Sequence, residues 1–291
     1  MAEDKSTQFV KILEEEGNRR GLPLRFLDFY KIINNVQSET EQNIDKTKLG
    51  LSIETINERL ERNRPLIGFD ELATDWPLVN DAYAKVIAVF SDYADILGEL
   101  PEKLKRPGTR PSLAKNVARA WLKGAKLPAS IKINNADEYI LLEAVIHATL
   151  KPFLVSNARV LIGPVNQERW RRDYCPVCHG KPDLAFLDSE RGARWLVCSR
   201  CDTKWLFQRL QCPYCGNQEQ DGLAYFTDDK GVYRLYVCEK CQKYIKAVDL
   251  RNAGQDVILP LERLLTLDMD RQAQEKGYKP GHSEDLIQST D

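Results

Sequence analysis

The sequence lacks the features of several common protein classes. No apolar run approaches the roughly 20 residues that a membrane-spanning helix needs. The first residues, MAEDKSTQF, are polar and contain no apolar core of a secretory signal. Neither sign of charge is in excess, since 42 Lys and Arg residues stand against 43 Asp and Glu residues, which gives no reason to expect a nucleic-acid or membrane-surface partner. We therefore expect a cytosolic protein without a membrane span.

Common catalytic motifs are also missing. The sequence has no Gly-rich phosphate loop, no His-Glu-x-x-His motif and no Gly-x-Ser-x-Gly motif. It has no flavin or nicotinamide fingerprint, and every cysteine belongs to a pair, so that no lone cysteine nucleophile stands out. These absences predict that the protein is not an enzyme.

Cysteine is absent from residues 1–174 and concentrated in one segment of the chain. All eight cysteines lie between residues 175 and 241, in four Cys-x-x-Cys pairs. In a reducing cytosol such pairs rarely persist as disulfides, and metal binding is their expected use. The candidate metal ligands are Cys175, Cys178, Cys198, Cys201, Cys212, Cys215, Cys238 and Cys241.

The spacing favours a sequential pairing of the four motifs. Nineteen residues separate Cys178 from Cys198 and 22 separate Cys215 from Cys238, and both intervals suit a hairpin that brings its ends together. Two such turns form a closed tetrahedral site of four thiolates. The first two pairs would then share one metal ion and the last two pairs another. A cross-braced arrangement, in which the first and third pairs share a metal, is the alternative.

An internal repeat supports the sequential pairing. The first copy reads CPVC and then LAFLDSERGARWLVCSRC, and the second reads CPYC and then LAYFTDDKGVYRLYVCEKC. In each copy a Cys-x-x-Cys turn, which we call a knuckle, precedes a strand-like run, a turn with glycine, a second strand and another knuckle. The turns centre on Ser189–Arg194 and Asp228–Gly231. We predict two copies of one metal-bound hairpin, each complete in itself.

The ligand set leaves the metal open between zinc, a single iron and an iron–sulfur cluster. The compact C-P-x-C form favours one ion per site. Gly216, which follows Cys215, can supply a positive φ, whereas His179 stands at the equivalent place in the first site. Either the first site differs slightly in geometry, or His179 donates to a sulfur, or it is an ordinary surface-loop histidine, which we favour. We also favour a structural role for both metals over a redox or catalytic one.

The cysteine-free part of the chain is predicted to be mostly helical. Asp75 can cap a helix that has Pro77 in its first turn, and a second helix begins near Asn135 with Glu138 as in a capping box, until Pro152 kinks or ends it. Weaker helical patterns lie at residues 6–17, 24–37, 52–62 and 112–123, and another at 261–276. Residues 101–111 read as a basic, proline-rich loop, and the last 15 residues as a loose tail.

Length and pattern together predict an α+β protein of several parts. A chain of 291 residues, with 43% hydrophobic and 29% charged residues, suits a soluble globular protein of about two domains. We predict an all-helical domain at residues 1–173, followed by two tandem rubredoxin-like or zinc-ribbon-like β-hairpin modules. The first four-cysteine module spans residues 174–210 and the second 211–250. A C-terminal helix and tail occupy residues 251–291.

Three strings of residues resemble a known family. They are Tyr174–Cys178, YCPVC; Arg194–Trp205, RWLVCSRCDTKW; and Cys238–Lys246, CEKCQKYIK. Each closely resembles the formate dehydrogenase accessory protein family, FdhE. The resemblance is specific over residues 174–249, and the order, spacing and length extend it over most of the chain. It implies a helical N-terminal part, two rubredoxin-like or zinc-ribbon-like modules, and all eight cysteines as ligands. His179 departs from it, because glycine is expected there.

The resemblance also implies a function. Such proteins are cytosolic maturation factors that act on the catalytic subunit of a respiratory formate dehydrogenase before its export and membrane assembly. Family members look like iron binders, so the resemblance implies iron or zinc as the cofactor, one ion per four-cysteine site. By this resemblance the protein is an assembly chaperone for formate dehydrogenase and not an enzyme.

Two other functions compete with this interpretation. A zinc-ribbon nucleic-acid-binding protein should be strongly basic, but residues 175–249 hold 11 Lys and Arg against 10 Asp and Glu, and two tetrathiolate metal sites bring the net charge to about −3. A rubredoxin-like redox protein would not need a long helical part, which suits protein docking better. The exposed knuckle tips expected to contact a partner are Pro176–His179, Ser199–Arg200, Pro213–Tyr214 and Glu239–Lys240.

Overall fold

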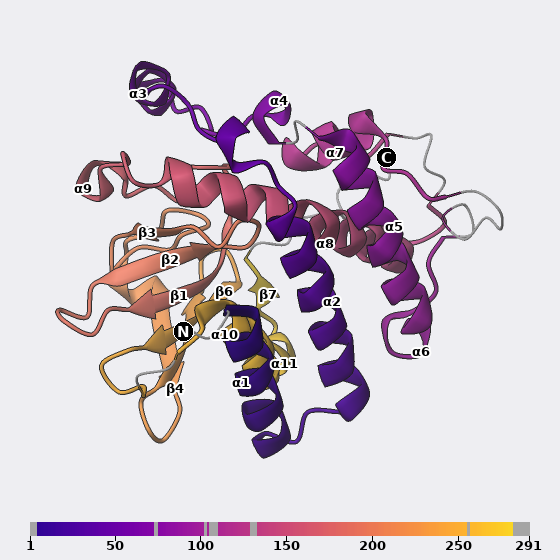
Figure 1. The fold of residues 1–291 in the computed structure, drawn as a ribbon. Coiled ribbons are helices and arrows are strands. Elements are labelled where there is room, and N and C mark those ends of the chain that lie inside the picture. The colour runs from indigo at the N-terminus through magenta and orange to yellow at the C-terminus, as the bar shows by residue number, and fades with distance from the viewer. Residues whose placement is uncertain are drawn as a thin grey trace. The chain divides into compact units, whose positions relative to one another are not determined.

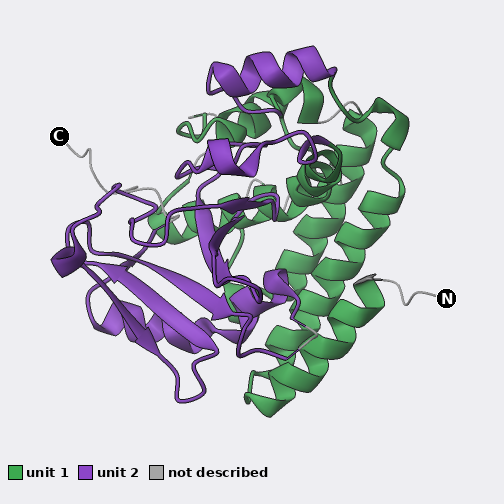
Figure 2. Cartoon of the chain, turned by 90° about the vertical axis from the view of Figure 1, so that its left-hand side faces the viewer, with its two compact units in different colours: residues 1–51, 67–160 green, residues 52–66, 161–291 purple. Residues whose placement is uncertain are grey.

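The structure is a computed structural model that describes residues 5–72, 75–101, 104, 110–128, 133–254 and 257–281. The chain forms two compact units whose boundaries do not follow its linear order. Unit 1 comprises residues 1–51 and 67–160, and unit 2 comprises residues 52–66 and 161–291 (Figure 2). The finer division that we predict at residues 173, 210 and 250 stays a prediction.

Unit 1 is helical, as Figure 1 shows. Within it, α2 packs against α1 and α5, and Phe29 of α2 meets Phe90 and Tyr93 edge to face, with ring centroids 5.2 and 5.5 Å apart. Both residues that were predicted to cap helices do so: Asp75 accepts from the Leu78 amide and Asn135 from the Glu138 amide. The helical elements are α1 Lys5–Arg19, α2 Leu24–Gln42, η1 Lys46–Lys48, α4 Phe69–Leu72, α5 Trp76–Asp92, α6 Ala94–Leu97, α7 Lys115–Leu122 and α8 Ala136–Leu161.

Helix α8 continues through Pro152 and is 26 residues long. By length and composition alone it could cross a membrane, so the expectation that no segment reaches this limit was too strict. However, 61% of its apolar window is buried inside the protein, as in the core helix of a soluble protein, and one such helix is weak evidence for a span. Leu142, Ile146, Leu150 and Leu154 on this helix are fully buried.

Unit 2 is built on one mixed sheet in which the two predicted modules are joined. The strand order is β3-β2-β1-β6-β5-β4, and β7 pairs with β6 (Figure 1). Strands β1 and β6 are parallel, from Leu184 opposite Lys246 to Leu187 opposite Asp249, and this pairing connects the two copies of the repeat. The strands are β1 Pro182–Leu187, β2 Arg194–Cys198, β3 Lys204–Leu206, β4 Leu223–Thr227, β5 Tyr233–Cys238, β6 Lys243–Asp249 and β7 Lys279–Pro280.

Each copy of the repeat forms a hairpin plus a third strand. The two hairpins turn in the same way: the Asp188 carboxylate accepts from the amides of Arg191 and Ala193, and the Asp228 carboxylate accepts from the Tyr233 amide. Gly192 and Gly231 take positive φ values of 63° and 66° in these turns. The repeat predicts both hairpins, whereas β3, the length of β6 and the β1–β6 pairing carry no signal that we identified.

Short helices complete unit 2. The predicted helix at 261–276 is two helices, which separate at Thr266, where φ is −120°. Leu259 of α10 packs on Leu184, Phe186, Val197 and Val248, while Ala273 of α11 packs on Leu235, Val237 and Tyr244. The helical elements of unit 2 are α3 Ile53–Glu61, α9 Gln167–Trp170, η3 Gln220–Gly222, α10 Leu259–Leu265 and α11 Leu267–Glu275.

Two predicted irregular segments lie largely outside the described residues. These are the basic loop at 101–111, of which 102, 103 and 105–109 are not described, and the tail from residue 282 onward. The start of the predicted tail is structured, because Lys279 and Pro280 pair with Lys243 and Tyr244 of β6.

A partly buried arginine, Arg263, joins α10 to the first module. Arg263 donates to both carboxylate oxygens of Asp183, at 2.7 and 2.9 Å, to Asp202 at 2.6 Å and to the Cys198 carbonyl at 2.8 Å. Burial acts to lower the pKa of Arg263, but the two carboxylates outweigh it and raise the pKa. The network therefore holds a knuckle of the first cysteine cluster against the helix.

Replacing this arginine tests the network. We expect Arg263→Met to lower the free energy of unfolding by about 3–5 kcal/mol, because two largely buried carboxylates lose their cation. The matched control is Arg271→Met on α11, where the side chain is 75% exposed and lies 3.8 Å from Glu275. Its effect should stay within about 0.5 kcal/mol. Urea denaturation of the metal-loaded protein measures both, and equal effects would contradict this role for Arg263.

Candidate metal centres

The structure brings the eight cysteines together as two clusters of four. Cys175, Cys178, Cys198 and Cys201 form the first site, and Cys212, Cys215, Cys238 and Cys241 form the second. Within each site all four Sγ atoms lie within 4.8 Å of one another. This is the sequential pairing; the cross-braced alternative does not occur among the described residues. The α+β class, with N-terminal helices and two four-cysteine clusters in a C-terminal sheet, is likewise confirmed.

The sulfur–sulfur distances fit a metal ion and not a disulfide. In the first site they are 3.6 Å for Cys175–Cys201 and 3.4 Å for both Cys178–Cys198 and Cys178–Cys201. In the second site Cys212–Cys241 and Cys215–Cys238 are each 3.7 Å apart. A disulfide needs about 2.05 Å. A tetrahedral ion with metal–sulfur bonds of about 2.3 Å separates its ligands by about 3.8 Å. Both clusters therefore suit zinc or a single iron.

All four knuckles share one backbone conformation. The residue after the second cysteine of each pair has a positive φ: 56° at His179, 57° at Asp202, 74° at Gly216 and 53° at Gln242. From this position its amide donates to the carbonyl of the first cysteine of the pair, at 2.8–3.3 Å across the four knuckles. Glycine alone signals this conformation in sequence, so only Gly216 was predicted. His179 adopts the same turn, and the first site has the same knuckle geometry as the others.

His179 is half-buried and not an ordinary surface-loop histidine. Its ring lies against Tyr174, with centroids 4.5 Å apart. Burial and then the charge of Arg172 lower the pKa of His179 to about 4, against an opposing hydrogen bond with the Arg64 backbone. Among the described residues no hydrogen bond joins this ring to a sulfur, and its buried Nε2 has no partner. His179 is thus neutral at pH 7 and packs beside the first site.

The two sites differ sharply in burial. All four cysteines of the first site are at most 2% exposed. Residues 52–66 reach this site, where the Leu66 amide donates to the Pro176 carbonyl and Arg59 in turn donates to the Leu66 carbonyl. In the second site Cys215 is exposed and Cys241 is intermediate. The second site is therefore the one that solvent can reach.

Burial also corrects the predicted contact surface. Pro176, Val177 and Pro213 are buried, so two of the four predicted knuckle tips are not freely exposed. Glu239 and Lys240, at the last knuckle, are exposed as predicted. Of the predicted tips, the one best placed to meet a partner belongs to the second site.

The thiols of each cluster differ in acidity. Burial raises the pKa of Cys175 and of Cys201 in the first site. Burial acts in the same direction at Cys198, but hydrogen bonds from the other three thiols outweigh it and lower the pKa. In the second site burial raises the pKa of Cys212 to about 11. Burial acts in the same direction at Cys215, but the Asn217 amide and the neighbouring thiols outweigh it and lower the pKa.

Several supporting residues were not identified from the sequence. The Thr203 hydroxyl lies 3.0 Å from Cys201 Sγ and can donate to it. A Cβ at Gly180 would stand 2.8 Å from Cys198 Sγ, so glycine lets the chain pass close to the sulfur. The amides of Val177 and Arg200 donate to sulfur at 3.4 Å. Only the position of Gly180, soon after a knuckle, could have suggested such a contact.

Comparison with known proteins agrees with this geometry. The family model described as the FdhE central domain matches residues 174–209, which contain the first site. A protein FdhE homologue from Aquifex aeolicus is 30% identical over 274 residues, covering 92% of this chain and 89% of the relative. The chain belongs to the FdhE family. Protein FdhE of Escherichia coli K12 is 26% identical to this family member over 139 residues, covering 46% of this chain and 44% of that protein.

A solved structure shows the same fold. The crystal structure of the FdhE protein from Pseudomonas aeruginosa matches 96% of this FdhE family member and 94% of its own chain, with a TM-score of 0.61 and 21% identity. The match therefore extends beyond the cysteine-rich segment and includes the helical part.

Mutation of single cysteines tests whether the two sites are separate. We expect Cys198→Ser and Cys212→Ser each to lose about one equivalent of metal, because a closed four-thiolate site loses one ligand while the other site keeps all four. Metal analysis of the purified variants measures this. Loss of both equivalents in either variant would contradict separate sites.

The difference in burial predicts different rates of metal release. With a colorimetric chelator in excess, one equivalent should leave the wild-type protein about tenfold or more faster than the other, because the first site must open before solvent reaches it. Cys198→Ser, which retains the second site, should show only the fast phase, and Cys212→Ser only the slow one. The reverse assignment would contradict the role given to burial.

Proposed function

We propose that this protein is an accessory factor for the assembly of formate dehydrogenase, and that it binds the catalytic subunit of that enzyme before export. The observation that carries the proposal is the FdhE relationship, which extends over 92% of the chain and accompanies two complete four-cysteine clusters. The proposed place of action is the cytosol, where eight thiols stay reduced and available to a metal.

The eight cysteines are the proposed ligands, with one iron or zinc ion in each site. Such an ion supplies a tetrahedral cross-link and, if it is iron, a one-electron redox couple. The residues of this chain hold the knuckles in shape through the four positive-φ turns and the Arg263 network. A structural role for the metals follows from this arrangement, since each ion would close one end of a small hairpin. Metal analysis after anaerobic, iron-replete expression separates iron from zinc.

We propose that the protein acts by binding and not by catalysis. A catalytic metal keeps an open coordination position, whereas each cluster here offers four thiolates and is closed by them. The four cysteines of the first site are moreover at most 2% exposed. Formate oxidation would therefore remain the task of the client enzyme.

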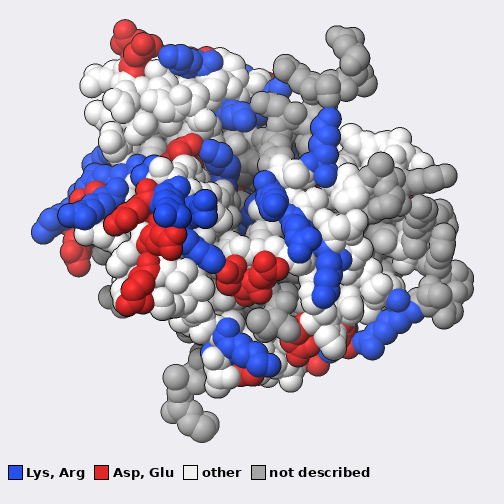
Figure 3. Space-filling model, turned by 90° about the horizontal axis from the view of Figure 1, so that it is seen from above, with Lys and Arg blue, Asp and Glu red and all other residues white. Residues whose placement is uncertain are grey.

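The surface charge favours a protein partner over a nucleic acid. On the left of the face shown in Figure 3, Lys and Arg side chains lie among Asp and Glu side chains, and the composition of the whole chain is balanced. Trp205 and Phe207 of the cysteine-rich segment are buried, and the Trp205 indole donates to the Arg172 carbonyl. A nucleic-acid site would instead need a basic surface with exposed aromatic rings.

Deletion of the gene tests the proposed function. Formate dehydrogenase activity should be lost while the catalytic subunit is still synthesised, because assembly and not expression depends on the factor. Complementation with the wild-type gene should restore activity, and with Cys212→Ser it should restore less. As a control, Leu24→Glu changes a side chain that is 70% exposed and should complement fully. Unchanged activity in the deletion strain, with no second copy of the gene, would contradict the proposal.

A further inference from the structure

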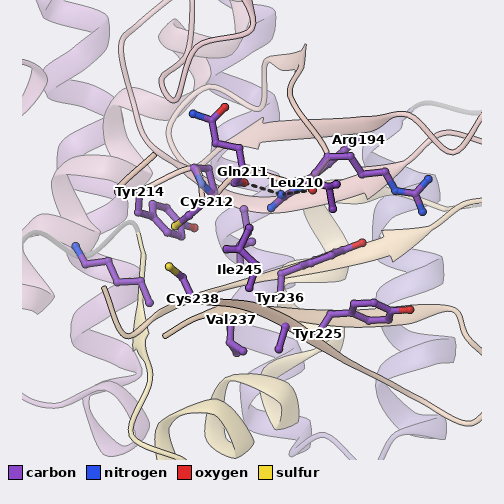
Figure 4. Close-up of a pocket in the computed structure, with 15 residues that line it drawn as sticks. Arg194, Leu210, Gln211, Cys212, Tyr214, Tyr225, Tyr236, Val237, Cys238 and Ile245 are labelled. Atoms are coloured by element: carbon purple, nitrogen blue, oxygen red, sulfur yellow. Dashed lines mark hydrogen bonds between the residues drawn. The ribbon is translucent and has the colours of Figure 1, made fainter. Parts of the chain in front are cut away.

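A pocket opens beside the second cysteine site, entirely within unit 2. Its volume is about 80 Å³, and it lies between residues 209–214 and one face of the sheet (Figure 4). Cys212 and Cys238 of the second site, Tyr236 of β5 and Ile245 of β6 contribute to its lining. The lining includes the cationic residues Arg194, Arg209 and Lys243 but no Asp or Glu. Apart from the metal-binding cysteines, every charged residue of the lining is therefore a cation.

Arg194 is the buried cation of this pocket. It is only 3% exposed, and its guanidinium lies 4.7 Å from the centroid of the Tyr236 ring. Its Nη1 donates to the carbonyls of Arg209 and Gln211, at 3.4 and 3.0 Å, as the dashed lines in Figure 4 mark. Nε and Nη2 are buried and have no hydrogen-bond partner among the described residues. Two charge-bearing donors are thus left unsatisfied, which is costly unless a ligand accepts from them.

The adjacent metal site does not supply that acceptor. A tetrathiolate site with a divalent ion carries a charge of about −2, which offsets part of the guanidinium charge. However, no hydrogen bond between Arg194 and a cysteine sulfur occurs in the described part of the chain. Arg194 lines a pocket whose other walls are mostly aromatic and aliphatic. A carboxylate attached to a short aliphatic chain suits both the guanidinium and the apolar walls. Its two oxygens can accept from two N–H groups of the guanidinium, and its aliphatic part can contact the walls.

The rim of the pocket indicates how the carboxylate is presented. Leu210 and Tyr225 line the pocket and are 60% and 52% exposed. Tyr225 belongs to β4, the last strand of the sheet, in which Ala224 to Thr227 are all exposed. An exposed sheet edge of this kind accepts an extended segment of another protein, whereas a free acid would leave the edge and the rim uncovered.

We propose that this pocket binds an acidic side chain, Glu or Asp, of an extended segment of a partner protein that covers Leu210 and Tyr225 and reaches Arg194. The inference rests on the proposed function, because it takes the catalytic subunit of formate dehydrogenase as the partner. It assigns the contact to the solvent-accessible second site and to the module that contains it.

Fluorescence anisotropy with labelled synthetic peptides that tile the catalytic subunit tests this inference, using the full-length, metal-loaded protein. At least one acidic peptide should bind saturably, and its Glu→Gln and Asp→Asn version should bind about tenfold or more weakly, because charge-assisted hydrogen bonds to Arg194 are lost. Leu210→Glu at the rim should weaken binding similarly through repulsion, and so should Arg194→Lys through loss of the fork. Leu24→Glu, which changes an exposed leucine of unit 1, should bind as the wild type does.

Binding of the intact catalytic subunit is measured in parallel. One outcome is that the intact subunit binds the wild-type protein, the Leu210→Glu variant and the Arg194→Lys variant equally tightly while no acidic peptide binds. This result overturns the pocket inference and leaves the proposed function standing. If butyrate binds as tightly as any peptide and Leu210→Glu has no effect, the site takes free acids and the peptide inference is again overturned. If the wild-type protein does not bind the intact subunit, the proposed function itself is contradicted. The choice of the catalytic subunit as the partner at the pocket is then contradicted as well.

Discussion

The structure of unit 2 depends on the crowding of four thiol groups at each of two points. Sulfur atoms at 3.4–3.7 Å cannot all be thiolates without a cation between them, because like charges at that distance repel strongly. A metal ion turns this repulsion into a cross-link that joins the two ends of a hairpin. Because β1 and β6 pair with each other, the two cross-links stabilise a single sheet and not two separate modules. In the described part of the chain two apolar clusters along that sheet have five buried residues each, and the cross-links add to the stability that these clusters provide.

The same repeat has given rise to two sites with different surroundings. Leu66 is hydrogen-bonded to Pro176 of the first site, and the Arg263 network holds one of the knuckles of this site against α10. The second site keeps Cys215 in solvent and has the Arg194 pocket on one side. We infer a division of tasks, in which the first site chiefly secures the fold and the second lies at the surface where a partner is recognised. A purely structural site would not explain why Cys215 is exposed or why the buried Arg194 guanidinium has two donors without a partner.

The sequence was most informative where chemistry leaves a local pattern. Cys-x-x-Cys spacing and the repeat predicted the grouping of all eight cysteines, and Asp75 and Asn135 predicted the starts of two helices. The sequence did not predict features that arise from pairing distant segments, such as the β1–β6 ladder and the contact of Leu66 with Pro176. It also did not predict that the helical segment at 261–276 divides into two helices at Thr266. It also missed three of the four positive-φ positions, since His179, Asp202 and Gln242 adopt a conformation for which only glycine is a reliable signal. Arg194 looked like an ordinary strand residue, because its burial depends on the segment at 209–214.

The central claim is that the two metal ions maintain the sheet of unit 2. Hydrogen exchange of the metal-loaded and the chelated, reduced protein, followed by mass spectrometry, tests it most directly. We predict that the amides of β1, β2, β5 and β6 lose protection when both ions are removed, whereas those of α2 and α5 in unit 1 keep theirs. Equal protection of the sheet with and without metal would contradict this claim.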